Sequence, residues 1–409
     1  MQAYYRLLKT DFKNRSNMNA YIVAGYRTAV GKAPRGGFRF TRPDDLGATV
    51  IRHLMEQTPQ LDPTRVDDVI VGNAVPEAEQ GMQMGRYVAL LSLPKNVSGI
   101  TINRYCGSGV EAIAMASAKI HAGMAECIIA GGTESMSLVP TMGWKTALNY
   151  EIAHTNPDYY LSMGLTAEQV AKDFNISREK QDEFSFQSHQ KALRAQKEGW
   201  FAEGIVPVTV KETYFDQASG KKKTKETVIS QDEGPRADTT VEALNKLKPV
   251  FAAGGSVTAG NSSQTSDGAA FVIVMSEKLV NELGLKPIAR MMSYATAGVD
   301  PRIMGIGPVA AVPLALKQAG LQLGDIQQVE LNEAFAAQAL AVIQELGIDP
   351  EIVNPNGGAI ALGHALGSTG ARLSVQLFNE MKRRDQKYGM VTACVGGGQG
   401  VAGIYERLN

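Results

Sequence analysis

The strongest constraint on how this 409-residue chain folds is a pattern that occurs twice, once toward each end. In both copies a short apolar strand finishes on an asparagine, a helix start containing Gly and Ser follows, and the helix leads into an apolar strand that ends in glycines. Three matches in the same order predict two α/β halves that pack by pseudo-symmetry. The first copy runs through 66–73, 106–109 and 126–132, and the second through 326–332, 364–370 and 390–398.

Cys106 opens the helix of the first copy. Residues 97–102 before it are short and β-branched and predict a strand, whereas residues 110–120 after it are rich in alanine and predict a helix. A thiol over the first turn of a helix faces unpaired N–H groups and the positive end of the helix dipole, so we expect a lowered pKa. The alternative is a buried cysteine that only packs, which is the commoner role of a free cysteine.

His364 holds the corresponding place in the second copy. It follows Asn332 by 32 residues, and Cys106 follows Asn73 by 33 residues. We expect pseudo-symmetric packing to bring the two helix starts together, with His364 as a base or hydrogen-bond donor to a cysteine nucleophile. The alternative is a structural histidine near a helix start.

Two further side chains in the second half complete a candidate group. Cys394 ends a strand before three glycines, whose backbone N–H groups suit an oxyanion hole, and a second thiol near the first could act as an acid or base. Asn332 could hold a water or a carbonyl, or could merely cap a turn. Cys127 lies inside an apolar strand and is expected to be structural. Two cysteines, a histidine and an asparagine, without metal-binding spacing or a nucleotide loop, suit acyl transfer through a thioester.

Composition excludes several classes of protein. Lys plus Arg and Asp plus Glu both number 41, so the net charge is zero, which argues against a general nucleic-acid binder. Three cysteines make no disulfide framework and indicate a reducing compartment, which we take as the cytoplasm. No apolar run reaches the length of a membrane span. Residues 1–17 lack the features of a secretory signal and are expected to form a disordered extension, with a transit peptide as the alternative.

The region between the two copies, roughly 140–270, does not follow the repeated pattern. Residues 166–174 and 177–196 predict two helices, and residues 206–215 and 221–229 predict a hairpin around 217–220. The lysines at 221–223 are expected to be solvated. Because loops on a rigid scaffold usually carry recognition, this region is interpreted as an insertion that bears substrate contacts.

The chain also resembles the thiolases, the acetyl-CoA C-acyltransferases, from Met18 onward. This resemblance implies an α/β fold whose two pseudo-symmetric halves form a layered αβαβα core with an inserted loop domain. The expected division is an extension at 1–17, an N-terminal half at 18–139 to which 255–285 returns, an inserted CoA-binding domain at 140–254, and a C-terminal half at 286–409. The segments that carry the resemblance are 103–109, 131–137, 257–264, 332–335, 357–364 and 394–400.

The resemblance implies a role for each candidate residue. Cys106 is the acyl-accepting nucleophile, His364 its activator and a donor to the thioester oxygen, and Cys394 the acid/base for the proton on the acetyl α-carbon. Asn332 holds a water of one oxyanion hole, and the backbone N–H groups of Cys106 and Gly396 form the other. Coenzyme A is a substrate here, and no metal or resident cofactor is implied. The residues expected along its path are Arg236, Phe251, Ala259 and Ser263, with Met163, Met304 and Phe335 nearby.

The implied activity is that of a 3-ketoacyl-CoA thiolase of fatty-acid β-oxidation, which cleaves 3-oxoacyl-CoA with CoA into acetyl-CoA and a shortened acyl-CoA. Residues 260–264 favour this degradative type over the alternative, a biosynthetic acetyl-CoA C-acetyltransferase that forms acetoacetyl-CoA. Two departures are Ala365, where the family usually has proline after the histidine, and Ser162, where many short-chain enzymes have histidine. The family also implies a homodimer or homotetramer.

Two rival readings stay open at this point. A decarboxylating condensing enzyme of the same broad fold would use a cysteine, a histidine and an asparagine without needing Cys394. A thiolase-like protein that carries acyl-CoA without turnover would need none of the catalytic groups. Nothing in the chain matches the local motifs of the cysteine proteases.

Overall fold

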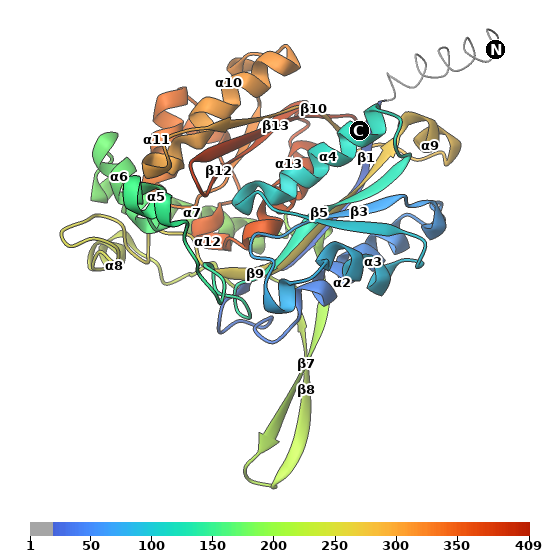
Figure 1. Cartoon of the computed structure of the whole chain (residues 1–409), viewed down its shortest axis with the longest axis horizontal. Helices are drawn as coiled ribbons and strands as arrows, with labels where there is room; N and C mark the ends of the chain where they lie inside the picture. The colour runs from blue at the N-terminus through green and yellow to red at the C-terminus, as the bar shows by residue number, and fades with distance from the viewer. Residues whose placement is uncertain (1–18) are drawn as a thin grey trace.

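The computed structural model describes residues 19–409, so the predicted extension at 1–17 lies outside the described residues. Within them, eleven strands join into one large sheet that helices flank (Figure 1). This mixed α/β architecture is the fold that the repeated pattern predicts.

The sheet consists of two halves with matching strand arrangements. The strands of the first half are β1 Ala20–Thr28, β3 Asp68–Gly72, β4 Ser98–Ile102, β5 Cys127–Ser135 and β9 Ser266–Ser276, and those of the second are β10 Ala289–Gly298, β11 Gln328–Leu331, β12 Tyr388–Val395 and β13 Gln399–Arg407. In the first half β3 is parallel to β4 and β5, and β9 runs antiparallel between β5 and β1. In the second half β11 is parallel to β12, and β13 runs antiparallel between β12 and β10. The halves meet where Ile22 of β1 pairs with Ala289 of β10.

Helices form three layers that alternate with the two sheet halves (Figure 1). The outer helices α2 Pro43–Gln57 and α3 Met84–Ser92 pack on the first half, and α10 Gly307–Ala319 and α11 Ala336–Leu346 pack on the second. Between the halves lie α4 Ser108–His121 and α13 Leu366–Arg383, whose buried apolar side chains share one core with strands of both halves. The αβαβα layering is therefore confirmed.

The two central helices touch through a pair of glycines. A Cβ on Gly109 would lie 2.5 Å from the backbone nitrogen of Ala371, and a Cβ on Gly370 would lie 2.4 Å from that of Val110. These reciprocal contacts make Gly109 and Gly370 equivalent by pseudo-symmetry, which places Gly367 in the position of Cys106.

The expectation that His364 is the equivalent of Cys106 is therefore wrong by three residues. His364 precedes α13, because a short helix, α12 Ala359–Leu362, and a left-handed turn at Gly363, with φ 101°, intervene before the long helix begins. The two helix starts nevertheless meet, as the repeated pattern predicts.

The segment between β5 and β9 carries helices and a hairpin. Its elements are α5 Tyr150–Thr155, α6 Met163–Asp173, α7 Arg178–Lys197, β6 Ile205–Val206, β7 Val208–Asp216, β8 Lys221–Ile229 and α8 Val241–Asn245. The helix predicted over 177–196 is confirmed as α7, with the Ser177 hydroxyl accepting from the N–H of Lys180. The helix predicted from residue 166 begins three residues earlier, because extended Ser162 is its N-cap and the hydroxyl of Thr166 donates to the carbonyl of Met163.

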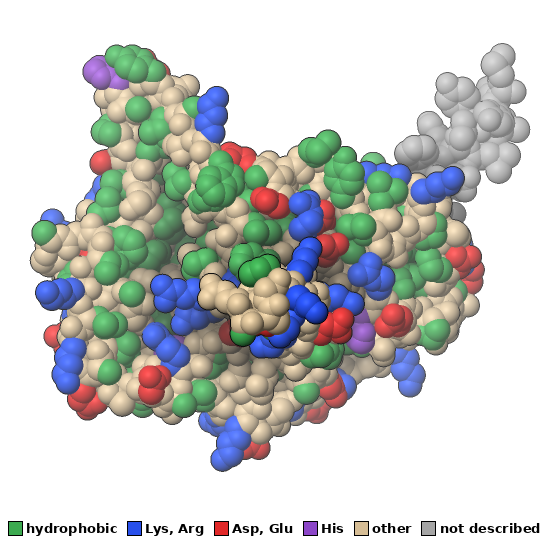
Figure 2. Space-filling model, turned by 90° about the horizontal axis from the view of Figure 1, so that it is seen from below, with side chains coloured by type: hydrophobic (Ala, Val, Ile, Leu, Met, Phe, Trp, Pro, Cys, Tyr) green, Lys and Arg blue, Asp and Glu red, His purple; other side chains and the backbone are tan. Residues whose placement is uncertain are grey.

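The predicted hairpin is confirmed as the pair β7–β8, which projects far from the body (Figure 1). Viewed from below, it points toward the reader, with Lys and Arg side chains gathered on and around it (Figure 2). The lysines at 221–223 are exposed as expected, although Lys223 also pairs with Asp216 at 2.6 Å. The α-helix and the strand not yet named in the described part of the chain are α9 Glu277–Glu282 and β2 Gly31–Lys32. Among residues 19–409, no helix combines the length and the hydrophobicity that crossing a bilayer requires.

Substitution of a contact glycine tests the packing of the middle layer. We expect Gly109→Ala to destabilise the protein, because overpacking against backbone costs about 1–3 kcal/mol, which exceeds the roughly 1 kcal/mol that alanine gains over glycine inside a helix. A fall in the melting temperature measures this loss. Gly324→Ala is the control, since a Cβ at Gly324 meets nothing within 4 Å; equal melting temperatures for both variants would contradict the prediction.

Candidate active site

Cys106 lies in a tight turn between β4 and α4. A single 3-10 turn, Tyr105–Gly107, connects them, and Tyr105 has the left-handed φ of 40° that non-glycine residues rarely adopt. The hydroxyl of Ser108 holds the turn, since it accepts from the N–H of Arg104 at 2.8 Å and donates to the carbonyl of Tyr105 at 2.7 Å. Backbone strain and side-chain hydrogen bonds together therefore fix where the thiol points.

The thiol of Cys106 is almost buried, with 8% of the residue exposed. Burial raises its pKa to about 12, while hydrogen bonds from the backbone N–H groups of Gly396 and of Cys106 itself act in the opposite direction. The expectation of a lowered pKa is thus wrong, because desolvation outweighs the start of the helix. The same two N–H groups are those expected to form an oxyanion hole.

Cys394 lies at the end of β12 and is completely buried. Burial and then the negative charge of a Cys106 thiolate raise its pKa, so the two thiols are close enough to interact electrostatically. All three cysteines are free, and Cys127 is buried inside β5 as expected. The side chains that pack with Cys394 are Ala167, Val257, Met304, Ala334 and Phe335, with Met163 partly buried against them.

His364 is held between α12 and α13 by its backbone and by both ring nitrogens. Its N–H donates to the carbonyl of Gln264 at 2.9 Å and to the hydroxyl of Ser266 at 3.1 Å. Nε2 lies 3.3 Å from Nδ2 of Asn332, and Nδ1 lies 2.7 Å from Oγ1 of Thr369. Burial, with a smaller effect of the Arg372 charge, lowers the pKa of His364 to about 3, so the imidazole is neutral at physiological pH.

Asn332 follows β11 directly and is fully buried. Its N–H donates to the carbonyl of Thr392 at 2.9 Å, two residues before Cys394, which brings the amide to the end of β12. Its Oδ1 has no hydrogen-bond partner among the described residues, as expected of a group that holds a water.

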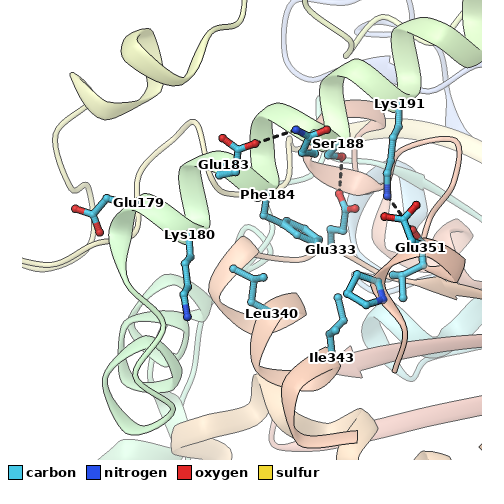
Figure 3. Close-up of a pocket in the computed structure, with 13 residues that line it drawn as sticks. Glu179, Lys180, Glu183, Phe184, Ser188, Lys191, Glu333, Leu340, Ile343 and Glu351 are labelled. Carbon is cyan, nitrogen blue, oxygen red and sulfur yellow. Dashed lines mark hydrogen bonds between the residues drawn. The ribbon is translucent and has the colours of Figure 1, made fainter. Parts of the chain in front are cut away.

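Glu333, the next residue, links three segments around this site. Its buried carboxylate accepts from the Ser188 hydroxyl of α7 at 2.7 Å (Figure 3). It also accepts from Nδ2 of Asn354 at 2.8 Å and from the N–H of Ile360 in α12 at 3.2 Å. The inserted segment, the end of β11 and the turn before His364 are therefore connected through one side chain.

A cavity of about 570 Å³ opens between α7 and α11, with Glu333 and Ser188 at its base (Figure 3). Apolar side chains such as Phe184, Leu340 and Ile343 form much of its lining. None of the predicted catalytic or CoA-binding residues lines this cavity, so it is separate from the group of catalytic candidates.

The structure brings the catalytic candidates together. Cys106 interacts with Gly396 and Cys394, Asn332 lies beside His364, and the turn that carries Cys106 packs on the start of α13. Residues 262–265 run past both loops, since Ser262 bridges to Phe335 and Thr265 bridges to His364.

The residues predicted along the CoA path divide into two sets. Met163, Met304 and Phe335 surround Cys394, and the ring of Phe251 meets that of Phe335 edge-to-face at 6.1 Å. Ser263 is adjacent to them, since its N–H donates to the carbonyl of Ala334. Arg236 and Ala259 lie exposed.

Sequence reasoning missed the side chains that hold the catalytic candidates in place. Thr369 and Ser266 contact His364, and Glu134 accepts from the N–H of Gly367 at the start of α13. Glu134 lies in a segment that carried the family resemblance, so its position offered a signal. Thr369 offered none, because a threonine in the first turns of a helix is common.

Comparisons with known proteins show which family this chain is similar to. The model of the thiolase N-terminal domain matches residues 20–278, and that of the thiolase C-terminal domain matches residues 285–407. A 3-ketoacyl-CoA thiolase of Bacillus subtilis is 53% identical over 95% of this chain and 99% of its own length. An acetyl-CoA acetyltransferase of Escherichia coli is 45% identical over 96% of this chain and 100% of its own. The crystal structure of the Bacillus anthracis acetyl-CoA acetyltransferase has a TM-score of 0.87 and 40% identity, covering 96% of this chain and 100% of that one.

The protonation states of the pair can be tested by alkylation. Because the pKa of Cys106 is raised to about 12 and that of His364 is lowered to about 3, both groups are neutral at pH 7. We expect the rate of Cys106 labelling by iodoacetamide, followed by peptide mass spectrometry, to keep rising with pH above about 9. A plateau of the rate between pH 6 and 8, below the titration of free cysteine near 8.5, would instead reveal a preformed thiolate–imidazolium pair.

Proposed function

Because this chain belongs to the thiolase family and is therefore an acyltransferase acting on CoA thioesters, we propose that it is a 3-ketoacyl-CoA thiolase. In the proposed reaction, CoA cleaves a 3-oxoacyl-CoA into acetyl-CoA and an acyl-CoA shorter by two carbons, as fatty-acid β-oxidation requires. The observations that carry the proposal are the interaction of the Cys106 and Cys394 thiols and the contact of His364 with Asn332, whose backbone is hydrogen-bonded to the strand that carries Cys394. The three free cysteines support a reducing compartment, the cytoplasm.

The degradative direction is preferred because the Bacillus subtilis 3-ketoacyl-CoA thiolase is 53% identical to this chain, whereas the Escherichia coli acetyl-CoA acetyltransferase is 45% identical. The runner-up is a biosynthetic acetyl-CoA C-acetyltransferase. The same residues serve both directions, since the reaction is reversible. The degradative and the biosynthetic enzyme differ in their preferred substrate and in the direction in which the reaction runs.

In the first half-reaction, the sulfur of Cys106 attacks the 3-keto carbon while its proton passes to Nε2 of His364. Because neither group is charged beforehand, proton transfer accompanies the attack. The bond between C2 and C3 then breaks, and the thiol of Cys394 gives its proton to C2. This step yields acetyl-CoA, an acyl-Cys106 thioester, a Cys394 thiolate and a protonated His364.

In the second half-reaction, the thiol of CoA attacks the acyl-Cys106 thioester and its proton passes to Cys394. The N–H groups of Cys106 and Gly396 stabilise the negative oxygen of this intermediate, a contribution often worth about 2.7–4 kcal/mol for each donor. Cys106 leaves as a thiolate and recovers its proton from His364, which restores every group. CoA is thus a substrate, and the proposal requires no resident cofactor.

The acyl-enzyme provides the decisive test. We expect incubation with a 3-oxoacyl-CoA, in the absence of free CoA, to add an acyl group to the peptide that contains Cys106, detected by mass spectrometry. Cys106→Ala should abolish the adduct and lower kcat by about 10⁴-fold or more, as loss of a nucleophile does elsewhere. Cys127→Ala is the matched control and should retain both.

Further activity and binding measurements distinguish the proposed function from the alternative functions. Full activity of Cys394→Ala would favour a decarboxylating condensing enzyme, and bound acyl-CoA without turnover would indicate a carrier. A kcat/KM for acetoacetyl-CoA far above that for a long 3-oxoacyl-CoA would favour the biosynthetic role.

We further infer that two copies associate through β4 and α3. In the described sheet β4 pairs only with β3, so its other edge is free to pair with a second strand. Exposed apolar side chains lie beside this edge, and a self-complementary patch of this kind suits a twofold dimer. These side chains are Tyr87, Leu90, Leu91 and Ile100.

Charge introduced into this patch should separate the copies. We expect the double variant Leu90→Glu/Ile100→Glu to elute as a 43.8 kDa monomer in light-scattering chromatography, whereas the unmodified chain elutes at twice that mass or a multiple of it. Leu314→Glu, an equally exposed leucine on α10, should leave the assembly unchanged. A monomeric unmodified chain, or a double variant that still dimerises, would contradict the inference.

A further inference from the structure

The side chain of Thr369 makes two polar contacts through one hydroxyl. Its Oγ1 lies 2.7 Å from Nδ1 of His364 and 2.9 Å from the carbonyl oxygen of Ala365, four residues earlier at the N-cap of α13. Thr369 is fully buried, so bulk solvent does not reach the hydroxyl. The single hydroxyl hydrogen can therefore be donated to only one of these two partners.

The carbonyl of Ala365 decides where that hydrogen lies. A carbonyl oxygen only accepts, so its contact with the hydroxyl is favourable only when Thr369 donates. The hydroxyl then has only lone pairs to offer to Nδ1 of His364, and that nitrogen must carry the ring proton. The opposite arrangement, in which Thr369 donates to Nδ1, would leave two acceptor oxygens facing each other at 2.9 Å with no hydrogen between them.

The other ring nitrogen supports the same assignment. Nε2 of His364 lies 3.3 Å from the amide nitrogen of Asn332, which only donates. A neutral imidazole with its proton on Nδ1 has its lone pair on Nε2, and therefore accepts from Asn332. The contacts at both ends of the ring are thus satisfied by a single tautomer.

We propose that Thr369 is a positioning residue that holds His364 in the tautomer protonated at Nδ1, so that Nε2 is the free base for the Cys106 thiol. This inference rests on the proposed function for the identity of the proton donor. Thr369 itself does not touch a reacting atom. Once Nε2 has taken the proton it becomes a donor, so one nitrogen serves first as the base and then as a hydrogen-bond donor to the substrate oxygen.

Nitrogen NMR of the full-length protein labelled with ¹⁵N-histidine measures the tautomer directly. The chain has five histidines, and His364→Asn identifies the resonances of His364 by their loss. We expect a protonated Nδ1 and an unprotonated Nε2 at neutral pH. Protonation of His364 at Nε2 in the unmodified protein would overturn the proposal whether or not the enzyme is active.

Substitution of Thr369 distinguishes a role in positioning His364 from a role in packing the core. We expect Thr369→Val, which keeps the shape but loses the hydroxyl, to lower kcat by about 10- to 100-fold, the usual range for losing the outer partner of a functional histidine. The KM for acyl-CoA should change little, and the NMR spectrum should show His364 with substantial protonation at Nε2. Thr369→Ser should restore both the tautomer and the rate.

A second hydroxyl on the same helix provides the control. Ser374 also donates to a carbonyl four residues earlier, that of Gly370, but contacts Tyr405 instead of His364. Ser374→Ala should leave the tautomer of His364 and kcat unchanged. If Thr369→Val keeps the tautomer and loses only thermal stability, the role of Thr369 is structural and the proposal fails. If Cys106 forms no acyl adduct while the tautomer is as expected, the proposed function fails instead.

Discussion

The contact between α4 and α13 is the interaction on which the rest of the molecule depends. Two helices from opposite ends of the chain approach so closely that their backbones touch, because glycines occupy the crossing point on both. The sheet halves enclose this pair, and the outer helices cover the sheet halves in turn. Each loop that begins a central helix therefore lies at the same buried place, where Cys106 and His364 come together although 258 residues separate them.

That arrangement explains which features the sequence could predict. A strand, a helix start and a glycine-ending strand repeated in order are local signals, and together they indicated two equivalent halves and their layered packing. The repeated pattern predicts less well which individual residues of the two halves are equivalent. Nearly equal intervals predict His364 as the counterpart of Cys106, but the inserted α12 turn makes Gly367 the structural counterpart. Equal spacing along a chain identifies an element, whereas only three-dimensional contacts identify a position within it.

The electrostatic prediction for Cys106 failed for a physical reason. A helix start favours a thiolate when solvent or a nearby cation also stabilises it. The cation in the motif around Cys106 is Arg104, and its guanidinium is paired with Glu111. The sequence does not reveal that β12 and β13 close over the thiol, with Gly107 packed against Val395 and Val401. Desolvation then exceeds the effect of the N–H groups and raises the pKa of the thiol to about 12.

Burial lowers the pKa of the His364 imidazole whereas it raises that of the Cys106 thiol, so both groups are neutral in the resting site. Because the pKa of the Cys106 thiol is raised and that of the His364 imidazole is lowered, the proton stays on the thiol until the sulfur attacks a substrate carbonyl. The cost of separating charge is then met by donors that are already in place, the N–H groups of Cys106 and Gly396 and the amide of Asn332. A neutral pair also requires the imidazole to present a lone pair, because a ring protonated at Nε2 could not accept the proton. The hydrogen bond from Nδ1 to Thr369 is therefore as necessary to this chemistry as the closeness of the two central helices.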